Sequence, residues 1–159
     1  MAGVDIRAFA STADAQWAAH AMAASEPWIT LGTGYERSLA LFGNESRERY
    51  LAQVAGESAG FLVVNMQGAF VGYVQLLGVA AKFRGQGVGR ALIAFAEQRI
   101  FRETPNVFIC VSDFNAQARA FYARLGYEMV GELKDFIVAG HSEFLLRKTI
   151  GPIRGASKS

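Results

Sequence analysis

The chain has 159 residues, 52% of them apolar, which is typical of a globular protein with one sizeable buried core. Its net charge of only +2 argues against nucleic acid as the main partner, because nucleic-acid-binding domains concentrate basic residues on one face. The single cysteine, Cys110, excludes an internal disulfide framework and any multi-cysteine metal site. We therefore expect a cytoplasmic globular protein that holds no metal.

The first half of the chain predicts a strand, two helices and then three strands. Val4–Phe9 alternates apolar and polar residues, as a half-buried strand does. Ser11 or Thr12 can cap a helix that runs to about Met22, and Tyr35–Phe42 carries a second, shorter helical pattern. Three strands joined by short turns, which we expect to form an antiparallel meander, follow at residues 49–55, 60–66 and 70–81.

The uncharged segment 59–81 is long enough to span a bilayer, but its sequence favours strands. It contains Asn65, Gln67 and Gln75, and Asn65–Gly68 reads as a turn. We therefore expect no membrane-spanning helix.

A basic, glycine-rich turn follows the third of these strands and leads into a helix that begins at about Val88. Glycines let the backbone approach a ligand closely. The first N–H groups of a helix lack partners within it, and the helix dipole favours negative charge at that end. Lys82, Arg84 and Arg90 add cationic side chains nearby. The segment therefore predicts a phosphate-binding turn.

Two common phosphate motifs do not fit this turn. The dinucleotide fingerprint needs a glycine at its sixth position, where counting from Gly85 finds Arg90, and the P-loop needs a Gly-Lys pair that the chain lacks. The pattern that does fit is Gln/Arg-x-x-Gly-x-Gly/Ala, at Arg84, Gly87 and Gly89. The structural alternative is a glycine-rich connection that only joins a strand to a helix.

The second half predicts a buried strand, a helix and two further strands. The expected strand Asn106–Val111 contains the continuous apolar run Val107–Val111, Asn115 can cap a helix, and Gly126 can end it. The last strands are expected at residues 127–130 and 143–149. The fold class is therefore α/β (α+β), with a mixed, mostly antiparallel sheet of about six to seven strands and helices on both faces. We expect one domain, residues 1–150, and a flexible tail, residues 151–159.

Two motifs together carry a family resemblance. The turn at Arg84–Arg90 resembles the pyrophosphate loop of the GCN5-related N-acetyltransferases (GNAT). The segment Asn115–Tyr127 is similar to the family's Asn-x-x-Ala-x-x-Phe-Tyr-x-x-x-Gly-Phe/Tyr pattern. The resemblance covers about residues 60–130. It implies the GNAT fold and an N-acetyltransferase that moves an acetyl group from acetyl-CoA to a primary amine, directly, through a tetrahedral intermediate, leaving CoA. The alternative is a non-catalytic acyl-CoA-binding or sensing module. Self-association through the final strands is common in this fold, so the resemblance also implies a homodimer.

The resemblance also implies a role for particular residues. The pantetheine arm would pair with strand backbone near Leu77 and Val79, Asn115 would contact that arm, and Tyr122 would face the sulfur. The pyrophosphate would lie on the backbone amides of the turn, which are those of Arg84, Gly85, Gln86, Gly87, Val88, Gly89 and Arg90.

Acetyl-transfer chemistry supports two of these roles. A strand amide such as that of Val79 can stabilise the oxyanion. A phenol with a pKa of about 10 stays protonated at neutral pH, so Tyr122 can act as general acid on the leaving sulfur. The structural alternatives are that Tyr122 is a core aromatic residue and that Asn115 is only a helix cap.

The attacking amine must lose a proton, and the sequence does not identify the residue that accepts it. Ribosomal-protein alanine acetyltransferases carry a glutamate where this chain has Cys110, so that base is absent. The candidates are Glu26, Asp113, Asp135 and Glu143, or a base relayed through water, and each carboxylate also reads as a solvated surface group. Cys110 itself reads as a core residue.

The acceptor would enter opposite the cofactor, near residues 25–35 and 134–142. Trp28, Tyr35 and Phe136 are the candidate substrate-binding residues, although Trp28 can equally be a packing residue. The sequence does not choose among a peptide N-terminus, a lysine, a polyamine, an amino sugar and an antibiotic.

Overall fold

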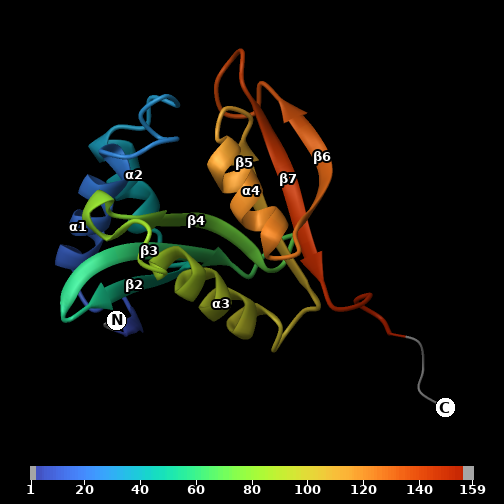
Figure 1. The fold of residues 1–159 in the computed structure, drawn as a ribbon, viewed down its shortest axis with the longest axis horizontal. Helices are drawn as coiled ribbons and strands as arrows, with labels where there is room; N and C mark the ends of the chain where they lie inside the picture. Colours follow the sequence, from blue (N-terminus) through green and yellow to red (C-terminus); the bar gives the residue numbers. More distant parts are fainter. Residues whose placement is uncertain (1–2, 156–159) are drawn as a thin grey trace. The chain divides into compact units, whose positions relative to one another are not determined.

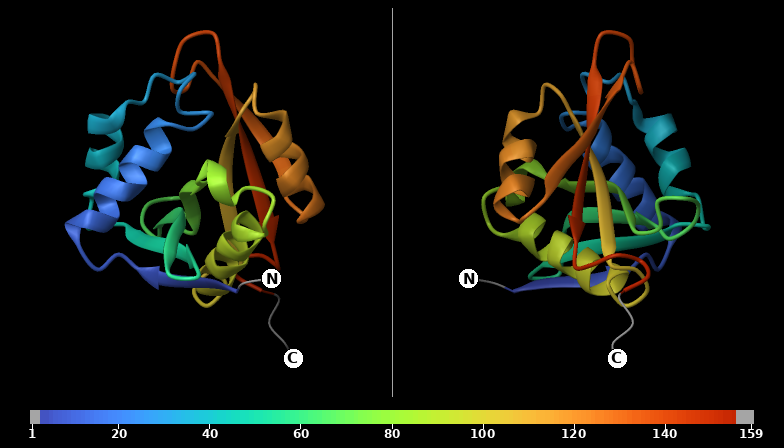
Figure 2. Two further views of the ribbon diagram at one scale, coloured as in Figure 1. Left: turned by 60° about the vertical axis from the view of Figure 1, so that its left-hand side comes forward. Right: turned by 90° about the vertical axis from the view of Figure 1, so that its right-hand side faces the viewer.

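The structure, a computed structural model, describes residues 3–155. The chain forms two compact units, which are described separately. Among the described residues, the first comprises residues 3–65 and Val74–Ala96, and the second comprises Met66–Tyr73 and residues 97–155. Figure 1 labels the elements of both units, and Figure 2 shows them from two further sides.

The first unit holds four strands, which follow one another in the order β1-β2-β3-β4. β1 pairs with β2, and β2 with β3, in antiparallel ladders, with a bulge between Ala52 and Gln53. Its helices are α1 and α2, which precede β2, the short 3-10 helix η1, and the first part of α3. The bounds are β1 Val4–Ala8, α1 Thr12–Ala23, α2 Tyr35–Phe42, β2 Glu48–Val54, β3 Glu57–Asn65, β4 Tyr73–Val79, η1 Ala81–Phe83 and α3 Val88–Ile100.

Helices cover both faces of the first unit's strands. Phe61 and Val63 in β3 are fully buried in a cluster that includes residues of α1 and Phe42 of α2. Side chains alternate along a strand, so Gly60 faces the other way, where an added Cβ would meet Val88 and Leu92 of α3. Figure 1 shows the same arrangement, with α1 and α2 on one side of these strands and α3 on the other.

The second unit is built on a three-stranded antiparallel ladder with the order β5-β7-β6. Its elements are β5 Asn106–Ser112, α4 Ala116–Arg124, β6 Glu128–Lys134 and β7 Ser142–Thr149. The guanidinium of Arg119 lies 5.0 Å from the ring centroid of Phe144, so α4 packs against β7. Figure 2 shows β6 and β7 as a long hairpin.

These elements confirm the predicted fold class, a mixed and mostly antiparallel α/β protein with seven strands and four α-helices among the described residues. The helix at Tyr35–Phe42 has the predicted bounds. Asn115 caps α4 through its side chain, which accepts a hydrogen bond from Ala118 N at 3.2 Å. Gly126, just after α4, has the left-handed φ of +93°.

Several predicted boundaries were wrong for identifiable reasons. The turn before β3 lies at Ala55 and Gly56, both with positive φ, so Glu57 and Ser58 belong to the strand. β6 continues to Lys134 because it pairs with β7 along its length. Ser11 is the N-cap of α1 but makes no side-chain cap bond. The carboxylate of Asp14 instead accepts Ala10 N at 2.7 Å.

No helix within residues 3–155 combines the length and apolar character needed to cross a bilayer. Residues 151–155 form no helix or strand, and the remainder of the predicted tail, 156–159, lies outside the described residues. The single-domain organisation stays a prediction.

Candidate functional site

The glycine-rich turn joins β4, through η1, to α3. Gly85 and Gly87 adopt φ values of +72° and +84°, which residues with a Cβ rarely adopt. A Cβ at either position would meet no atom within 4 Å. The two glycines are therefore required by backbone conformation and not by packing, and the turn leaves room for a ligand to approach its backbone.

The helix that follows offers unpaired donors at its start. The first backbone hydrogen bond of α3 runs from Ala91 N to Gly87 O at 3.0 Å. The N–H groups of Val88, Gly89 and Arg90 precede that bond and point out of the helix end, where the helix dipole is positive. An open turn beside such donors fits a pyrophosphate group.

The cationic side chains around this turn differ in how they are held. Lys82 Nζ lies 2.7 and 2.8 Å from the two carboxylate oxygens of Glu57, so an acid already neutralises it. Arg84 donates to Val79 O at 3.3 Å and to Ser25 Oγ at 3.2 Å. Arg90 is exposed. Arg84 therefore fixes the turn to the end of β4 and to the segment after α1.

The end of β4 is tightly packed against β3. An added Cβ at Gly78 would overlap the ring of Phe61, and one at Gly60 would lie 2.8 Å from Gly78 O. Ala80 N donates to Ala59 O at 2.8 Å. The backbone around Leu77 and Val79 is thus held rigidly in place.

Tyr122 lies in α4 of the second unit and is only 5% exposed. Its ring packs edge-on against those of Phe121 and Tyr127, with centroids 5.1 and 5.4 Å away. Burial raises the pKa of Tyr122 above its ordinary value, so the phenol is protonated at neutral pH and can donate a proton or a hydrogen bond. Asn115, before the same helix, acts as its cap and is half-buried.

The four candidate bases lie in different environments. Glu26 and Asp135 are exposed, and each carboxylate accepts a backbone N–H, from Thr30 at 3.2 Å and from Gly140 at 2.7 Å. Asp113 accepts Ser142 N at 2.8 Å and lies 3.1 Å from His141 Nδ1. These bonds, that from Ser142 foremost, lower the pKa of Asp113.

Glu143 differs from the other three because it is buried, with 5% of its surface exposed. Its interpretation as a solvated surface carboxylate was therefore wrong. Sequence reasoning also missed Ser112, which lies opposite Glu143 across the β5–β7 ladder and is 1% exposed. Its only sequence signal was a polar residue directly after the apolar run. No group of acidic, histidine and cysteine side chains within residues 3–155 is suited to hold a metal ion.

The three predicted substrate-binding aromatics do not share one environment. Trp28 and Tyr35 are partly buried against the core cluster of the first unit. The ring of Trp28 lies 5.6 Å from that of Phe61, and Tyr35 stacks on His20 at 4.3 Å. Phe136 belongs to the second unit and is 58% exposed.

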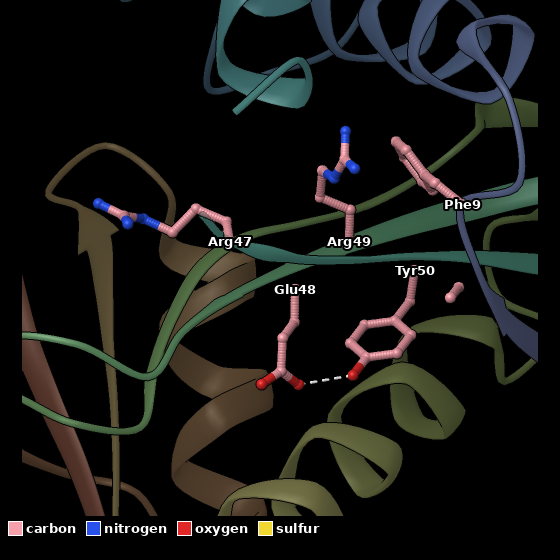
Figure 3. A pocket seen from close by; sticks show the side chains of 6 residues that line it. Phe9, Arg47, Glu48, Arg49 and Tyr50 are labelled. Carbon is pink, nitrogen blue, oxygen red and sulfur yellow. Dashed lines mark hydrogen bonds between the residues drawn. The ribbon is translucent and has the colours of Figure 1, made fainter. Parts of the chain in front are cut away.

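A surface pocket of about 220 Å³ lies at the start of β2, away from the predicted site residues. Figure 3 shows Arg47, Arg49 and Phe9 on one side of the strand and Glu48 with Tyr50 on the other. Arg49 donates to Phe42 O at 2.8 Å, Arg47 to Gln75 Oε1 at 3.1 Å, and Tyr50 to Glu48 Oε1 at 2.6 Å. Since these polar groups already form hydrogen bonds within the protein, we do not interpret the pocket as a ligand-binding site.

Comparisons with known proteins place this chain, including its glycine-rich turn, among acetyltransferases. Residues 9–127 match the family model described as "Acetyltransferase (GNAT) family". Blasticidin-S acetyltransferase of Streptomyces morookaense is 35% identical over 99 residues, 62% of this chain and 72% of that protein.

Two solved structures of antibiotic acetyltransferases are similar in fold. Nourseothricin acetyltransferase has a TM-score of 0.60 and 27% identity, covering 67% of this chain and 66% of its own. Aminoglycoside 6'-N-acetyltransferase complexed with coenzyme A has a TM-score of 0.74 and 18% identity, covering 96% of this chain and 99% of its own.

The family match spans more than half of the chain and includes both the turn and Tyr122. GNAT acetyltransferases use acetyl-CoA, so the predicted cofactor is confirmed. This chain belongs to the acetyltransferase (GNAT) family.

Proposed function

We propose that this chain is an N-acetyltransferase that passes an acetyl group directly from acetyl-CoA to a primary amine. The observation that carries the proposal is the open turn at Gly85 and Gly87, followed by the unpaired N–H groups that begin α3. Such a turn suits the pyrophosphate of CoA, and acetyl-CoA, when bound, supplies an activated acetyl thioester.

The backbone amides from Arg84 to Arg90 would hold the pyrophosphate, and the backbone near Leu77 and Val79 would hold the pantetheine arm. In support, bonds from Arg84 and tight packing at Gly78 fix both stretches before any ligand arrives. A preorganised backbone loses little conformational entropy on binding. The N–H of Val79 would then donate to the oxygen on which negative charge develops.

Tyr122 would donate a proton to the leaving sulfur. Its burial keeps the phenol protonated at neutral pH, and packing of its ring against Phe121 and Tyr127 restricts its orientation. Asn115, which caps the same helix, would contact the pantetheine arm through its side-chain amide while its oxygen accepts Ala118 N.

A small-molecule amine is the acceptor class that we propose to test first. The curated relative described above acts, by its name, on blasticidin S. Trp28, Tyr35 and Phe136 stay the proposed acceptor-binding residues. A cytoplasmic location and a homodimer stay proposals too, the first supported only by the single cysteine.

A calorimetric titration tests the cofactor half of this proposal. Acetyl-CoA and CoA should bind at one saturable site, and ATP should bind far more weakly. If a folded protein released no heat on titration with acetyl-CoA or CoA, that result would contradict the proposed cofactor site. Incubation of the acetyl-CoA complex with blasticidin S and an aminoglycoside then tests the transfer half.

A further inference from the structure

The second unit carries a group of polar side chains on one face of its strands. Ser112 in β5 is paired with Glu143 in β7, and Cys110 with Leu145. Directly paired residues point to the same side of an antiparallel ladder, and alternate residues along a strand share a face. Cys110, Ser112 and Glu143 therefore lie on one face. Phe144, which α4 covers through Arg119, lies on the other.

Two of these side chains each have a buried oxygen that makes no hydrogen bond within the described residues. Glu143 is 5% exposed and Ser112 is 1% exposed, and neither Glu143 Oε2 nor Ser112 Oγ has a partner within the described chain. Buried polar atoms are nearly always bonded, so such exceptions need an explanation. An oxygen buried without a protein partner costs stability, which a hydrogen bond to a water or a ligand would offset.

The groups facing Glu143 have known partners. Asp113 is held by Ser142 N and His141, and the Tyr73 hydroxyl and the Cys110 thiol lie close enough to shift each other's pKa. Across the β6–β7 ladder, the residue paired with Glu143 is the apolar Leu133. Thus, of the four candidate bases, only Glu143 combines burial with an unbonded oxygen.

The environment also changes the acidity of Glu143. Burial raises its pKa above the ordinary value, Ser112 lowers it as a hydrogen-bond donor, Asp113 raises it and His141 lowers it, with a net rise. The Ser112 hydroxyl makes no bond in the static geometry but is free to turn toward the carboxylate. A carboxylate whose pKa is raised toward physiological pH is a stronger base, so it accepts a proton from an ammonium group more readily.

We propose that Glu143 is the general base that takes a proton from the ammonium group of the acceptor before the amine attacks, a role that rests on the acetyltransferase function proposed above. One N–H bond of the ammonium breaks and one O–H bond forms on Glu143 Oε2, which leaves a neutral, nucleophilic amine. The carboxyl later returns the proton to water, so the step needs no other reactant.

The test compares Glu143→Gln with Glu132→Gln. Glutamine keeps the size of the side chain but cannot accept the proton. Glu132 lies on the neighbouring strand β6 and is exposed, which makes the second variant a control for loss of the same charge. Acetyl-CoA affinity is measured by calorimetry, and kcat/KM is measured with blasticidin S and an aminoglycoside from pH 6 to 10.

Glu143→Gln should keep acetyl-CoA affinity within twofold and lose about 10²- to 10⁴-fold in kcat/KM near pH 7. The loss should shrink by about one decade per pH unit as the free amine becomes abundant, since an amine has a reference pKa of about 8 to 10.4. Glu143→Asp should recover part of the activity, and Glu132→Gln should match the wild type.

Equal kcat/KM for Glu143→Gln and wild type across this range would overturn the base assignment while leaving the acetyltransferase function intact. A loss that stayed constant at every pH would overturn it as well, because it would indicate a positional effect. Failure of the wild type to acetylate any amine would contradict the proposed function itself, and the base assignment with it.

Discussion

The ring of Phe61 in β3 fills the space that a side chain at Gly78 in β4 would occupy. An ideal Cβ at Gly78 would lie 2.8 Å from Phe61 Cε1 and 2.9 Å from its Cε2. Phe61 is 1% exposed and packs edge-on against Phe42, with centroids 5.0 Å apart, so its ring has little freedom to move.

Gly78→Ala should therefore lower the free energy of unfolding by about 1–3 kcal/mol, as overpacking of a filled core does. Urea denaturation measures the change. Gly131→Ala is the control, since a Cβ there meets no atom within 4 Å, and it should change stability by less than about 0.5 kcal/mol. Equal stability of the two variants would contradict the packing argument.

Gly87→Asp should weaken acetyl-CoA binding at least tenfold, because a carboxylate would face the pyrophosphate. Gly68→Asp controls for backbone strain. Its φ is +82°, close to the +84° of Gly87, and a Cβ at either position meets nothing within 4 Å. Both variants should lose similar stability, and only Gly87→Asp should lose affinity in calorimetry. Unchanged affinity of Gly87→Asp for acetyl-CoA would contradict the proposal that the pyrophosphate binds at this turn.

Tyr122→Phe should reduce kcat by about 10²- to 10⁴-fold with acetyl-CoA affinity kept, since phenylalanine retains the ring packing and removes only the proton donor. Tyr127→Phe is the matched control. The Tyr127 hydroxyl donates to Glu97 at 3.0 Å, where Lys148 also binds at 3.0 Å. That variant should cost about 1 kcal/mol of stability and keep turnover. Full activity of Tyr122→Phe would end the general-acid assignment.

Asp14→Asn should destabilise the chain by about 1–3 kcal/mol at pH 7. Asp14 lies 2.7 and 3.1 Å from the Arg7 guanidinium, and the bonds from Arg7 lower its pKa. A lowered pKa means that the stabilisation is complete above the unfolded value of about 3.9 and is lost as pH falls through the folded value. Thermal unfolding should show the two chains converging at low pH, while the exposed control Asp5→Asn stays near wild type throughout.

Glu143→Gln should raise the melting temperature at neutral pH. The pKa of Glu143 is raised in the fold, so wild-type stability falls as pH rises from the unfolded value, about 4.3, to the higher folded value. Removing the buried charge should recover this loss, at about 2–4 °C per kcal/mol for a chain of this size. Near pH 4 the two chains should melt together. A lower melting temperature for the variant at neutral pH would contradict this description of the carboxylate.

The local features of the site were predictable from sequence, because short-range backbone chemistry determines them. Gly87 needs a left-handed φ, and Asn115 accepts the N–H of Ala118 three residues away. α2 has its predicted bounds for the same reason, since a helical period is a local pattern.

The environment of Glu143 was not predictable in this way. A glutamate in an alternating strand usually faces solvent, and its burial here depends on strand pairing with Ser112, far away in the sequence. The extension of β6 to Lys134 has the same origin, because pairing with β7 overrides a polar local sequence. The register between strands that are far apart in the sequence determines whether such residues are buried or paired, and local sequence patterns do not reveal that register.

The most direct test of the acetyltransferase function is to quantify both products of one reaction. Purified protein is mixed with acetyl-CoA and blasticidin S, free CoA thiol is followed with a thiol reagent, and the acetylated amine is counted by mass spectrometry. One CoA should be released for each amide formed, over many turnovers. Tight acetyl-CoA binding with no amide from blasticidin S, an aminoglycoside or a peptide N-terminus would contradict it and favour a non-catalytic acyl-CoA-binding module.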